Sequence, residues 1–197
     1  MSKISIIDYG VGNLKSLYNF IKKFEQNVII TSNKLEIYSS SLIILPGVGA
    51  FASVIKTLKD RKLEKIITKL ADDRVPIVGI CAGMQILASS SNEFGKSEGL
   101  NLIEGEINQM NNFNIGWRKI KKIKKQSAII FNEENHFFFN HSYKFECNTK
   151  YKICISATEE EVNSIIIKDN IYGFQFHPEK SGIAGEELFE NFLGEVL

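Results

Sequence analysis

The chain has 197 residues, of which 44% are hydrophobic and 24% charged, which is enough for one α/β domain with a buried core. A formal net charge of +1 excludes an overall field that would attract nucleic acid or an anionic membrane, and no apolar run approaches the ~20 residues of a transmembrane helix. Three cysteines without metal-ligand spacing, and an N-terminus that lacks the pattern of a signal peptide, predict a cytoplasmic protein without a metal or other cofactor.

The first half of the chain alternates short apolar runs with amphipathic stretches. The apolar runs predict buried strands at residues 4–8, 28–31, 42–45 and 75–80. Apolar residues at helical spacing predict helices at residues 13–24, 50–58 and 63–71. Asn13 is the expected N-cap of the first helix. This alternation is typical of open α/β sheets, which place their binding sites at the carboxyl ends of the strands.

The second half of the chain has a different pattern. A polar, glycine-containing loop is expected at residues 92–100 and a closing helix at residues 185–193. Between them, short strands are expected at residues 105–110, 119–123, 128–131, 137–140, 153–157, 164–168 and 171–175. Because no linker or repeat is visible, the sequence predicts a single domain over residues 1–197. Its expected fold class is α/β, with an open, mostly parallel twisted sheet flanked by helices and an added antiparallel portion.

The pattern Gly-x-Cys-x-Gly places Cys81 between Gly79 and Gly83. It is the cysteine form of the nucleophile elbow, a strained turn from a strand into a helix. The glycines are needed because neighbouring chain packs closely against such a turn. At the N-terminus of the following helix, a cysteine is favoured as the nucleophilic thiolate. Taken alone, the pattern also fits a small buried cysteine in a core strand.

Two further segments support a catalytic interpretation. The run Pro-Gly-Val-Gly at residues 46–49 follows a strand, and its glycines allow a backbone N–H to point outward, as an oxyanion hole requires. At the end of the last strand, Pro178 directs the chain out of the ladder and leaves the ring of His177 free. Glu179 can then orient that ring, as the carboxylate does in a catalytic triad.

These segments resemble the class I (triad) glutamine amidotransferases, and within them the glutaminase subunits of imidazole glycerol phosphate synthase. The resemblance runs from Ile6 to the last helix, and its matching segments are residues 8–14, 45–51, 79–85, 116–117, 141–143 and 173–181. It implies that Cys81 attacks the carboxamide of L-glutamine, that His177 transfers the proton and that Glu179 orients His177.

The resemblance also implies roles for residues around the nucleophile. The N–H groups of Val48 and Ala82 would form the oxyanion hole. The remaining glutamine-binding residues would be Gly47, Gly49, Gly83, Gln85, Glu93, His141, Ser142 and Tyr143.

In this subfamily ammonia passes to a synthase or cyclase partner, a (β/α)₈ barrel that makes imidazole glycerol phosphate for histidine biosynthesis. The resemblance therefore implies a heterodimer with a partner-facing surface made by Tyr9, Asn13, Trp117, Arg118, Phe138 and Lys180. The sequence departs from the subfamily at Ala82, where leucine is usual, and at Arg118, where asparagine is usual. The Pro-His pair that normally precedes Gly116 is absent, and Phe138 and Asn140 replace the usual Tyr and Val. These departures leave the triad intact but weaken the prediction of the partner's identity.

Three alternatives stay open. Close relatives donate ammonia to enzymes that amidate N-acetylated sugars for surface polysaccharide, and the altered partner-facing residues fit that role. The chain could also be a non-catalytic binding subunit with an amidotransferase-like fold, although Cys81, His177 and Glu179 are all present. A stand-alone thiol hydrolase of γ-glutamyl compounds would need no partner.

Overall fold

The structure is a computed structural model that describes residues 2–10, 13–47, 49–125, 129–156 and 160–197. Its helices are α1 (Leu14–Ile21), α2 (Lys34–Tyr38), α3 (Phe51–Asp60), α4 (Glu64–Asp72), α5 (Ala82–Gln85) and α6 (Gly182–Val196), with 3₁₀ turns at Thr149–Tyr151 and Pro178–Lys180. Its strands are β1 (Ile4–Ile7), β2 (Val28–Thr31), β3 (Leu42–Leu45), β4 (Ile77–Ile80), β5 (Ser90–Ser91), β6 (Ser97–Glu98), β7 (Gly105–Lys122), β8 (His136–Cys147), β9 (Lys152–Ser156), β10 (Val162–Lys168) and β11 (Ile171–Phe174).

The parallel part of the sheet has the order β2-β1-β3-β4-β11. Strands β1, β3 and β4 are buried at every position, as expected for parallel strands covered on both faces. The order places β4 beside β11, with Gly79 opposite Gly173 and Ile80 opposite Phe174. The segments that follow these two strands therefore begin side by side at one edge of the sheet.

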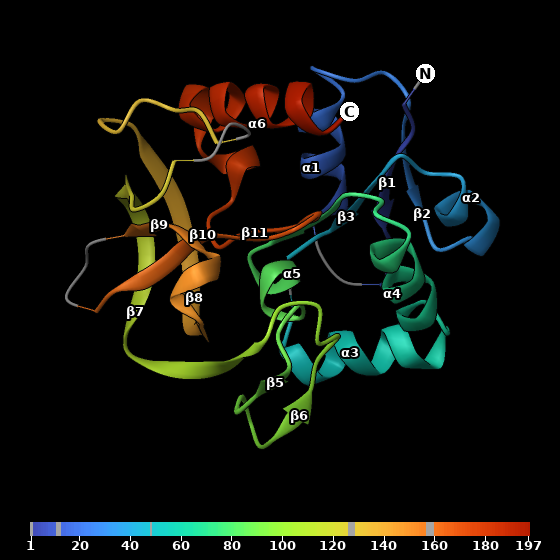
Figure 1. The fold of residues 1–197 in the computed structure, drawn as a ribbon, viewed down its shortest axis with the longest axis horizontal. Helices are drawn as coiled ribbons and strands as arrows, with labels where there is room; N and C mark the ends of the chain where they lie inside the picture. Colours follow the sequence, from blue (N-terminus) through green and yellow to red (C-terminus); the bar gives the residue numbers. More distant parts are fainter. Residues whose placement is uncertain (1, 11–12, 48, 126–128, 157–159) are drawn as a thin grey trace.

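The antiparallel part continues from β11 through β10, β9 and β7, and β8 pairs with the other portion of β7. In Figure 1 these strands form the end of the molecule opposite to α2 and β2. The β7–β8 ladder has one large irregularity: Gln109 lies opposite Tyr143, but the next pair is Asn114 with His141. Four residues of β7 thus lie opposite Ser142 alone, which separates its backbone from the regular ladder.

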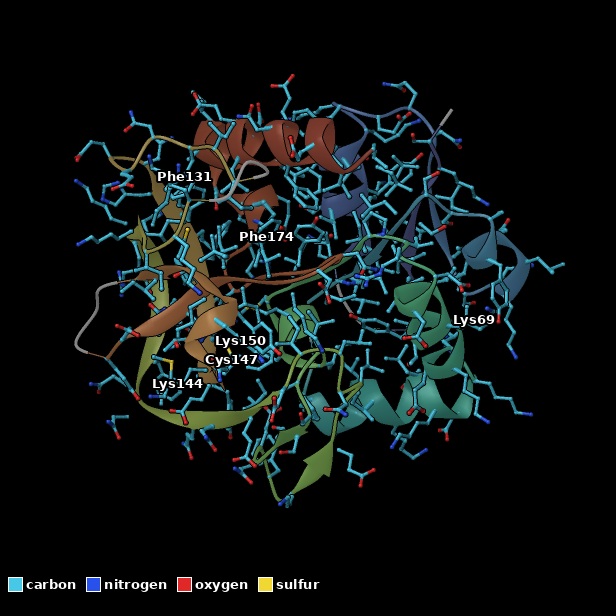
Figure 2. The ribbon with its side chains drawn as sticks, viewed as in Figure 1. Lys69, Phe131, Lys144, Cys147, Lys150 and Phe174 are labelled. Carbon is cyan, nitrogen blue, oxygen red and sulfur yellow. The ribbon has the colours of Figure 1, made fainter. Side chains whose placement is uncertain are left out.

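Helices cover both faces of the parallel strands, α1 and α6 on one and α3 and α4 on the other (Figure 1). Alternate residues of each strand enter different cores: Leu42 and Ile44 pack with α1 and α6, whereas Ile43 and Leu45 pack with α3 and α4. Phe174 lies in the core beneath α6 (Figure 2), with its ring centroid 5.5 Å from that of Phe192.

The predicted α/β class with an added antiparallel portion is confirmed, but several elements differ. The strands predicted at residues 105–110 and 119–123 are one strand, β7. The loop predicted at residues 92–100 contains β6, which pairs with β5, and the short helix α2 was not predicted. Of the strand predicted at residues 128–131, position 128 lies outside the described residues and 129–131 have no strand pairing. No described helix has the length and apolar character needed to cross a membrane.

Candidate functional site

Cys81 occupies the tight turn between β4 and α5. Its backbone has φ 53° and ψ −111°, a conformation that is rare and costly for a residue with a side chain. Its N–H donates a hydrogen bond to the carbonyl of Phe174 at 2.7 Å, which ties the turn to β11. The helix that follows the turn, α5, has only four residues.

Three glycines make room for this turn. A Cβ atom on Gly47 would lie 1.8 Å from the carbonyl oxygen of Ile80 and 2.7 Å from the Ala82 nitrogen. A Cβ on Gly79 would lie 2.3 Å from the carbonyl oxygen of Gly83, and one on Gly83 would lie 1.9 Å from a backbone carbonyl of β3. The elbow can pack this closely only because these positions have no side chain.

The structure brings the three predicted triad residues together. His177 follows β11, and its N–H donates to the carbonyl of Phe138 on β8 at 2.9 Å. The ring atom Nδ1 of His177 lies 2.8 Å from Oε1 of Glu179. The ring also interacts with the side chain of Cys81, which favours its charged form. The side chains of His177 and Glu179 are only 5% and 8% exposed, so bulk water screens this arrangement weakly.

The charges around His177 favour the imidazolium. Burial desolvates the ring and lowers its pKa, but hydrogen bonds and charge interactions with Cys81 and Glu179 outweigh this effect and raise the pKa to about 9. The ring can thus exist as the imidazolium, the form that can give a proton to a leaving group.

The predicted oxyanion loop lies directly against the elbow. Val48 is outside the described residues, so its predicted N–H donor has no described position. Gly47 packs within reach of the Ala82 nitrogen, and Gly49 has φ +108°, a backbone conformation suited to glycine. Tyr9 donates its hydroxyl hydrogen bond to the carbonyl of Pro46. This contact fixes the beginning of the loop to β1.

Several predicted glutamine-binding residues form one network beside Cys81. The Gln85 side chain donates from Nε2 to the carbonyl of Tyr143 at 2.9 Å. His141 contacts the same carbonyl through Nδ1 at 2.8 Å. Ser142 lies between these two β8 residues, at the register break. Gly83 packs at the elbow instead, so its position is explained by close backbone contact.

Glu93 has a structural contact of its own. Its Oε2 accepts a hydrogen bond at 2.6 Å from the N–H of Phe51, the first residue of α3. Ala50 precedes that helix and provides no side-chain cap. Glu93 therefore caps α3 beside the Gly49 loop, a favourable position for a carboxylate.

Other residues of the site were not predicted from the sequence. Gln175 is fully buried; its Nε2 lies 3.9 Å from the Cys81 sulfur and its Oε1 lies 3.4 Å from Nε2 of Gln85. The carbonyl of Asn140 lies 3.8 Å from the same sulfur. The one sequence signal for Gln175 is a polar side chain two positions before His177 in an otherwise apolar strand.

Three of the predicted partner-facing residues form a common surface. The Trp117 ring is half exposed and contacts the Phe138 ring edge-on, with centroids 5.8 Å apart. The side chain of Lys180 lies over the ring of Phe138, with its Nζ 5.8 Å from the ring centroid. We call Trp117, Phe138 and Lys180 the aromatic surface.

The other predicted partner-facing residues are placed differently. Arg118 donates to the carbonyls of Trp117 and Ile115 at 3.0 and 3.1 Å, so its guanidinium lies along β7. Asn13 is exposed, and its Oδ1 accepts from the Ser16 N–H at 3.2 Å, as expected of an N-cap. Tyr9 is only 1% exposed. Because its side chain is buried against Pro46, Tyr9 supports the oxyanion loop and offers no area to a partner, contrary to the prediction.

The two other cysteines lie apart from this chemistry. Cys147 lies in the antiparallel portion (Figure 2), and burial raises the pKa of its thiol to about 11. Burial likewise raises the pKa of Cys154 to about 12. Both are therefore held as unreactive thiols. Within the described ranges, no group of three or more His, Cys, Asp or Glu side chains is arranged to hold a metal ion.

Known proteins with the same fold include several glutamine amidotransferases. PurLQS from Thermotoga maritima matches with a TM-score of 0.76 and 19% sequence identity, over 100% of this chain and 99% of that one. A structure described as a glutamine amidotransferase matches with a TM-score of 0.77 and 14% identity, over 98% and 97% of the two chains. At these identities the likeness concerns the fold.

Sequence comparison gives a nearer relationship. The subunit HisH of imidazole glycerol phosphate synthase from Bacillus cereus (strain ATCC 10987 / NRS 248) is 37% identical over 198 residues, covering 98% of this chain and 95% of the relative. HisH from Bacillus anthracis (strain A0248) has the same identity and coverage. The sequence profile described as "Glutamine amidotransferase class-I" matches residues 5–196. The chain therefore belongs to the class I glutamine amidotransferases.

Proposed function

We propose that this chain is the glutamine-hydrolysing subunit of an imidazole glycerol phosphate synthase, with Cys81, His177 and Glu179 as its catalytic residues. The observation that carries the proposal is the buried His177–Glu179 pair, whose ring also interacts with the side chain of Cys81. A nucleophile, a base and a group that orients the base are the three parts that acyl transfer from an amide requires.

In the proposed reaction, the thiolate of Cys81 attacks the carboxamide carbon of L-glutamine. The negative oxygen that forms is stabilised by the N–H of Ala82 and by the loop at residues 46–49, with Val48 as the expected second donor. When this tetrahedral intermediate collapses, the C–N bond breaks and His177 gives its proton to the departing nitrogen, which leaves as ammonia.

A γ-glutamyl thioester on Cys81 is then hydrolysed. His177, now neutral, takes a proton from water, and the hydroxide formed attacks the thioester carbon. The C–S bond breaks, glutamate leaves and the thiolate–imidazolium pair is restored. Glu179 keeps Nδ1 of His177 as the protonated ring atom throughout both halves of the reaction.

The pathway assignment is supported by the relatives named HisH, to which this chain is 37% identical over 98% of its length. We infer that the ammonia is passed to a synthase or cyclase subunit, in a heterodimer, and that this partner is a (β/α)₈ barrel. The aromatic surface supports this inference, because exposed aromatic rings beside a cation are typical of protein interfaces. Its Phe138 lies on β8, and the Phe138 carbonyl accepts a hydrogen bond from the His177 N–H.

Co-purification of the native chain, followed by identification of the bound protein, tests this proposal. A cyclase subunit is expected. Glutamine hydrolysis should be slow in the isolated chain and at least about tenfold faster with the partner and its ligand, since association can complete a catalytic arrangement. A sugar-amidating enzyme as partner would support the alternative acceptor, and rapid hydrolysis that no partner increases would indicate a stand-alone hydrolase.

The variant Cys81→Ala separates the two activities of the complex. It removes the nucleophile, so the expected result is loss of glutamine-dependent synthesis with retention of synthesis from added ammonium. Loss of both activities in a complex that still assembles would contradict the proposed division of labour. Undiminished glutamine hydrolysis by the variant would contradict the triad.

A further inference from the structure

Asn114 of β7 and His141 of β8 form a buried polar pair close to the proposed active site. They lie opposite each other in the antiparallel ladder, and they are only 3% and 8% exposed. Asn114 Nδ2 lies 2.9 Å from His141 Nε2. Asn114 is on none of the sequence motifs that indicated the reaction, so its burial here calls for a physical reason.

The hydrogen bonds of this pair determine where the protons are. A carbonyl can only accept, so the 2.8 Å contact between His141 Nδ1 and the Tyr143 carbonyl places a proton on Nδ1. Burial keeps the ring neutral, with its pKa lowered to about 4 although the Tyr143 contact opposes that change. Nε2 of a neutral ring with Nδ1–H must accept, and Nδ2 of Asn114 is the donor.

This orientation leaves a polar atom unsatisfied. Oδ1 of Asn114 is buried and has no hydrogen-bond partner in the described part of the chain. The amide therefore loses hydrogen-bonding energy at one atom while it orients His141 with the other. Such local conflicts are expected where function and stability make different demands on one side chain.

The pair acts on the backbone that borders the register break. The Tyr143 carbonyl accepts from His141 on one side and from Gln85 Nε2, at 2.9 Å, on the other. Gln85 Nε2 also donates to Oε1 of Gln175, and Nε2 of Gln175 lies 3.9 Å from the Cys81 sulfur. The side chains of His141 and Gln85 thus hold the Tyr143 carbonyl directly beside Ser142, the residue that the ladder skips.

We propose that Asn114 is a positioning residue for glutamine binding: by holding His141 with the proton on Nδ1, it fixes the Tyr143 carbonyl and thereby the backbone of residues 142–143 beside Cys81. The inference rests on the proposed glutaminase function and adds to it a residue and a required tautomer. Asn114 does not touch the reacting atoms, so its effect is expected in substrate binding and not in the chemical step.

The first test is the ring tautomer of His141 in the wild-type chain. The chain has three histidines, so ¹⁵N-detected ring spectra at neutral pH can be assigned with variants that each lack one histidine. A neutral ring protonated on Nδ1 is expected for His141. An Nε2–H ring would overturn the proposal, whatever the activity of the enzyme.

The second test is Asn114→Asp, which keeps the shape but replaces the donor with an acceptor. His141 is expected to carry its proton on Nε2 instead of Nδ1, so that Nδ1 no longer donates to the Tyr143 carbonyl; the KM for glutamine should then rise at least about tenfold while kcat changes less than about threefold. Asn191→Asp is the matched control, since it makes the same change at an exposed position on α6. Asn114→Ala removes the donor without adding a charge. It is the variant to measure if Asn114→Asp does not fold.

The outcomes separate the two hypotheses. An unchanged KM and an unchanged His141 spectrum in a folded, active Asn114 variant would overturn the positioning role and leave the proposed function intact. Absence of glutamine hydrolysis by the wild-type chain together with its partner would overturn the proposed function itself. A raised KM with the altered ring spectrum, and neither change in Asn191→Asp, would support the positioning role.

Discussion

At the scale of single residues, the site contains two histidines whose surroundings move their pKa values in opposite directions. The pKa of His177 is raised to about 9, because Cys81 and Glu179 favour the charged ring by more than burial disfavours it. The pKa of His141 is lowered to about 4, mainly by burial, and the nearby charge of His177 adds to this effect. The ring of His177 can therefore carry the catalytic proton, while the ring of His141 stays neutral, with one nitrogen as donor and the other as acceptor.

The raised pKa of His177 predicts the alkaline limit of activity. Below about pH 9 the ring is protonated and can deliver a proton to the leaving nitrogen; as pH rises through about 9 that proton is lost. We therefore expect kcat/KM for glutamine, which reports on the free enzyme, to fall on the alkaline side near pH 9. A pH profile of the complex, with stability monitored in parallel, measures it.

Glu179→Gln tests the cause of that limit. The variant removes the charge that stabilises the imidazolium, so the alkaline limb should move to lower pH and kcat should fall. Protonated His177 also stabilises the fold, because its pKa in the folded chain is above the ordinary value of 6.5. This contribution to the free energy of unfolding is complete below pH 6.5 and is lost as pH rises towards 9. An alkaline limb at the same pH in Glu179→Gln would show that the carboxylate does not control His177.

At the scale of elements, the elbow depends on contacts between backbones. A Cβ atom on Gly83 would lie 1.9 Å from the carbonyl oxygen of Leu45, a distance that no side-chain rearrangement can relieve. Neither β3 nor β4 can withdraw without disturbing its neighbours, because both are central in the sheet. The spacing of the glycines around Cys81 is therefore a packing requirement as much as a catalytic one.

This contact predicts a large loss of stability in Gly83→Ala. The free energy of unfolding should fall by at least about 3 kcal/mol, or the variant should fail to fold, since backbone atoms would overlap. Gly194→Ala is the matched control, because a Cβ there meets nothing within 4 Å and lies in α6. It should stabilise the helix by up to about 1 kcal/mol. Chemical denaturation of both variants measures the difference, and equal stabilities would refute the packing argument.

The elements also show which sequence signals were sufficient. Apolar runs predicted the strands of the parallel part, because β1, β3 and β4 are buried on both faces and need apolar residues throughout. The long strand β7 was divided in two, because much of it is exposed and its central segment carries several polar residues. The segment 129–131 is apolar without being a strand, since Ile129 and Phe131 enter the core from a loop.

At the scale of the whole molecule, the site depends on which strands become neighbours. The sequence placed Cys81 and His177 at the ends of two strands, and the general rule for α/β sheets placed both at one edge. That β4 and β11 are adjacent, with Ile80 opposite Phe174, is a property of the sheet order. Spacing along the chain does not reveal it, and the family resemblance implied only that Cys81 and His177 act together.

Other parts of the site could not be predicted because they depend on register and depth. The Asn114–His141 pair exists only because of the break in the β7–β8 ladder, and nothing in the local sequence fixes the size of that break. Tyr9 was expected at the partner-facing surface because the family resemblance implied it. Its burial against Pro46 follows from how β1 and β3 pack side by side.

The same sheet order predicts where a partner must bind to influence catalysis. The aromatic surface of Trp117, Phe138 and Lys180 lies at the β7–β8 end, and Phe138 is joined to His177 through a backbone hydrogen bond. A partner seated there would contact the strand that borders the triad. A partner seated on α2, beyond the opposite edge strand β2, would meet no part of the site (Figure 1).

Trp117→Ala is therefore expected to weaken binding of the cyclase subunit at least about tenfold, because half-exposed aromatic side chains are frequent hot spots once an interface buries them. Leu35→Ala, on α2, is the matched control: Leu35 is 80% exposed and Trp117 is 50% exposed, so each variant removes an accessible apolar side chain. Titration calorimetry with the purified partner measures both affinities. If Leu35→Ala abolished binding of the partner and Trp117→Ala did not, the partner would bind the opposite edge of the sheet. Any increase in glutamine hydrolysis at Cys81 would then have to be transmitted through the parallel strands.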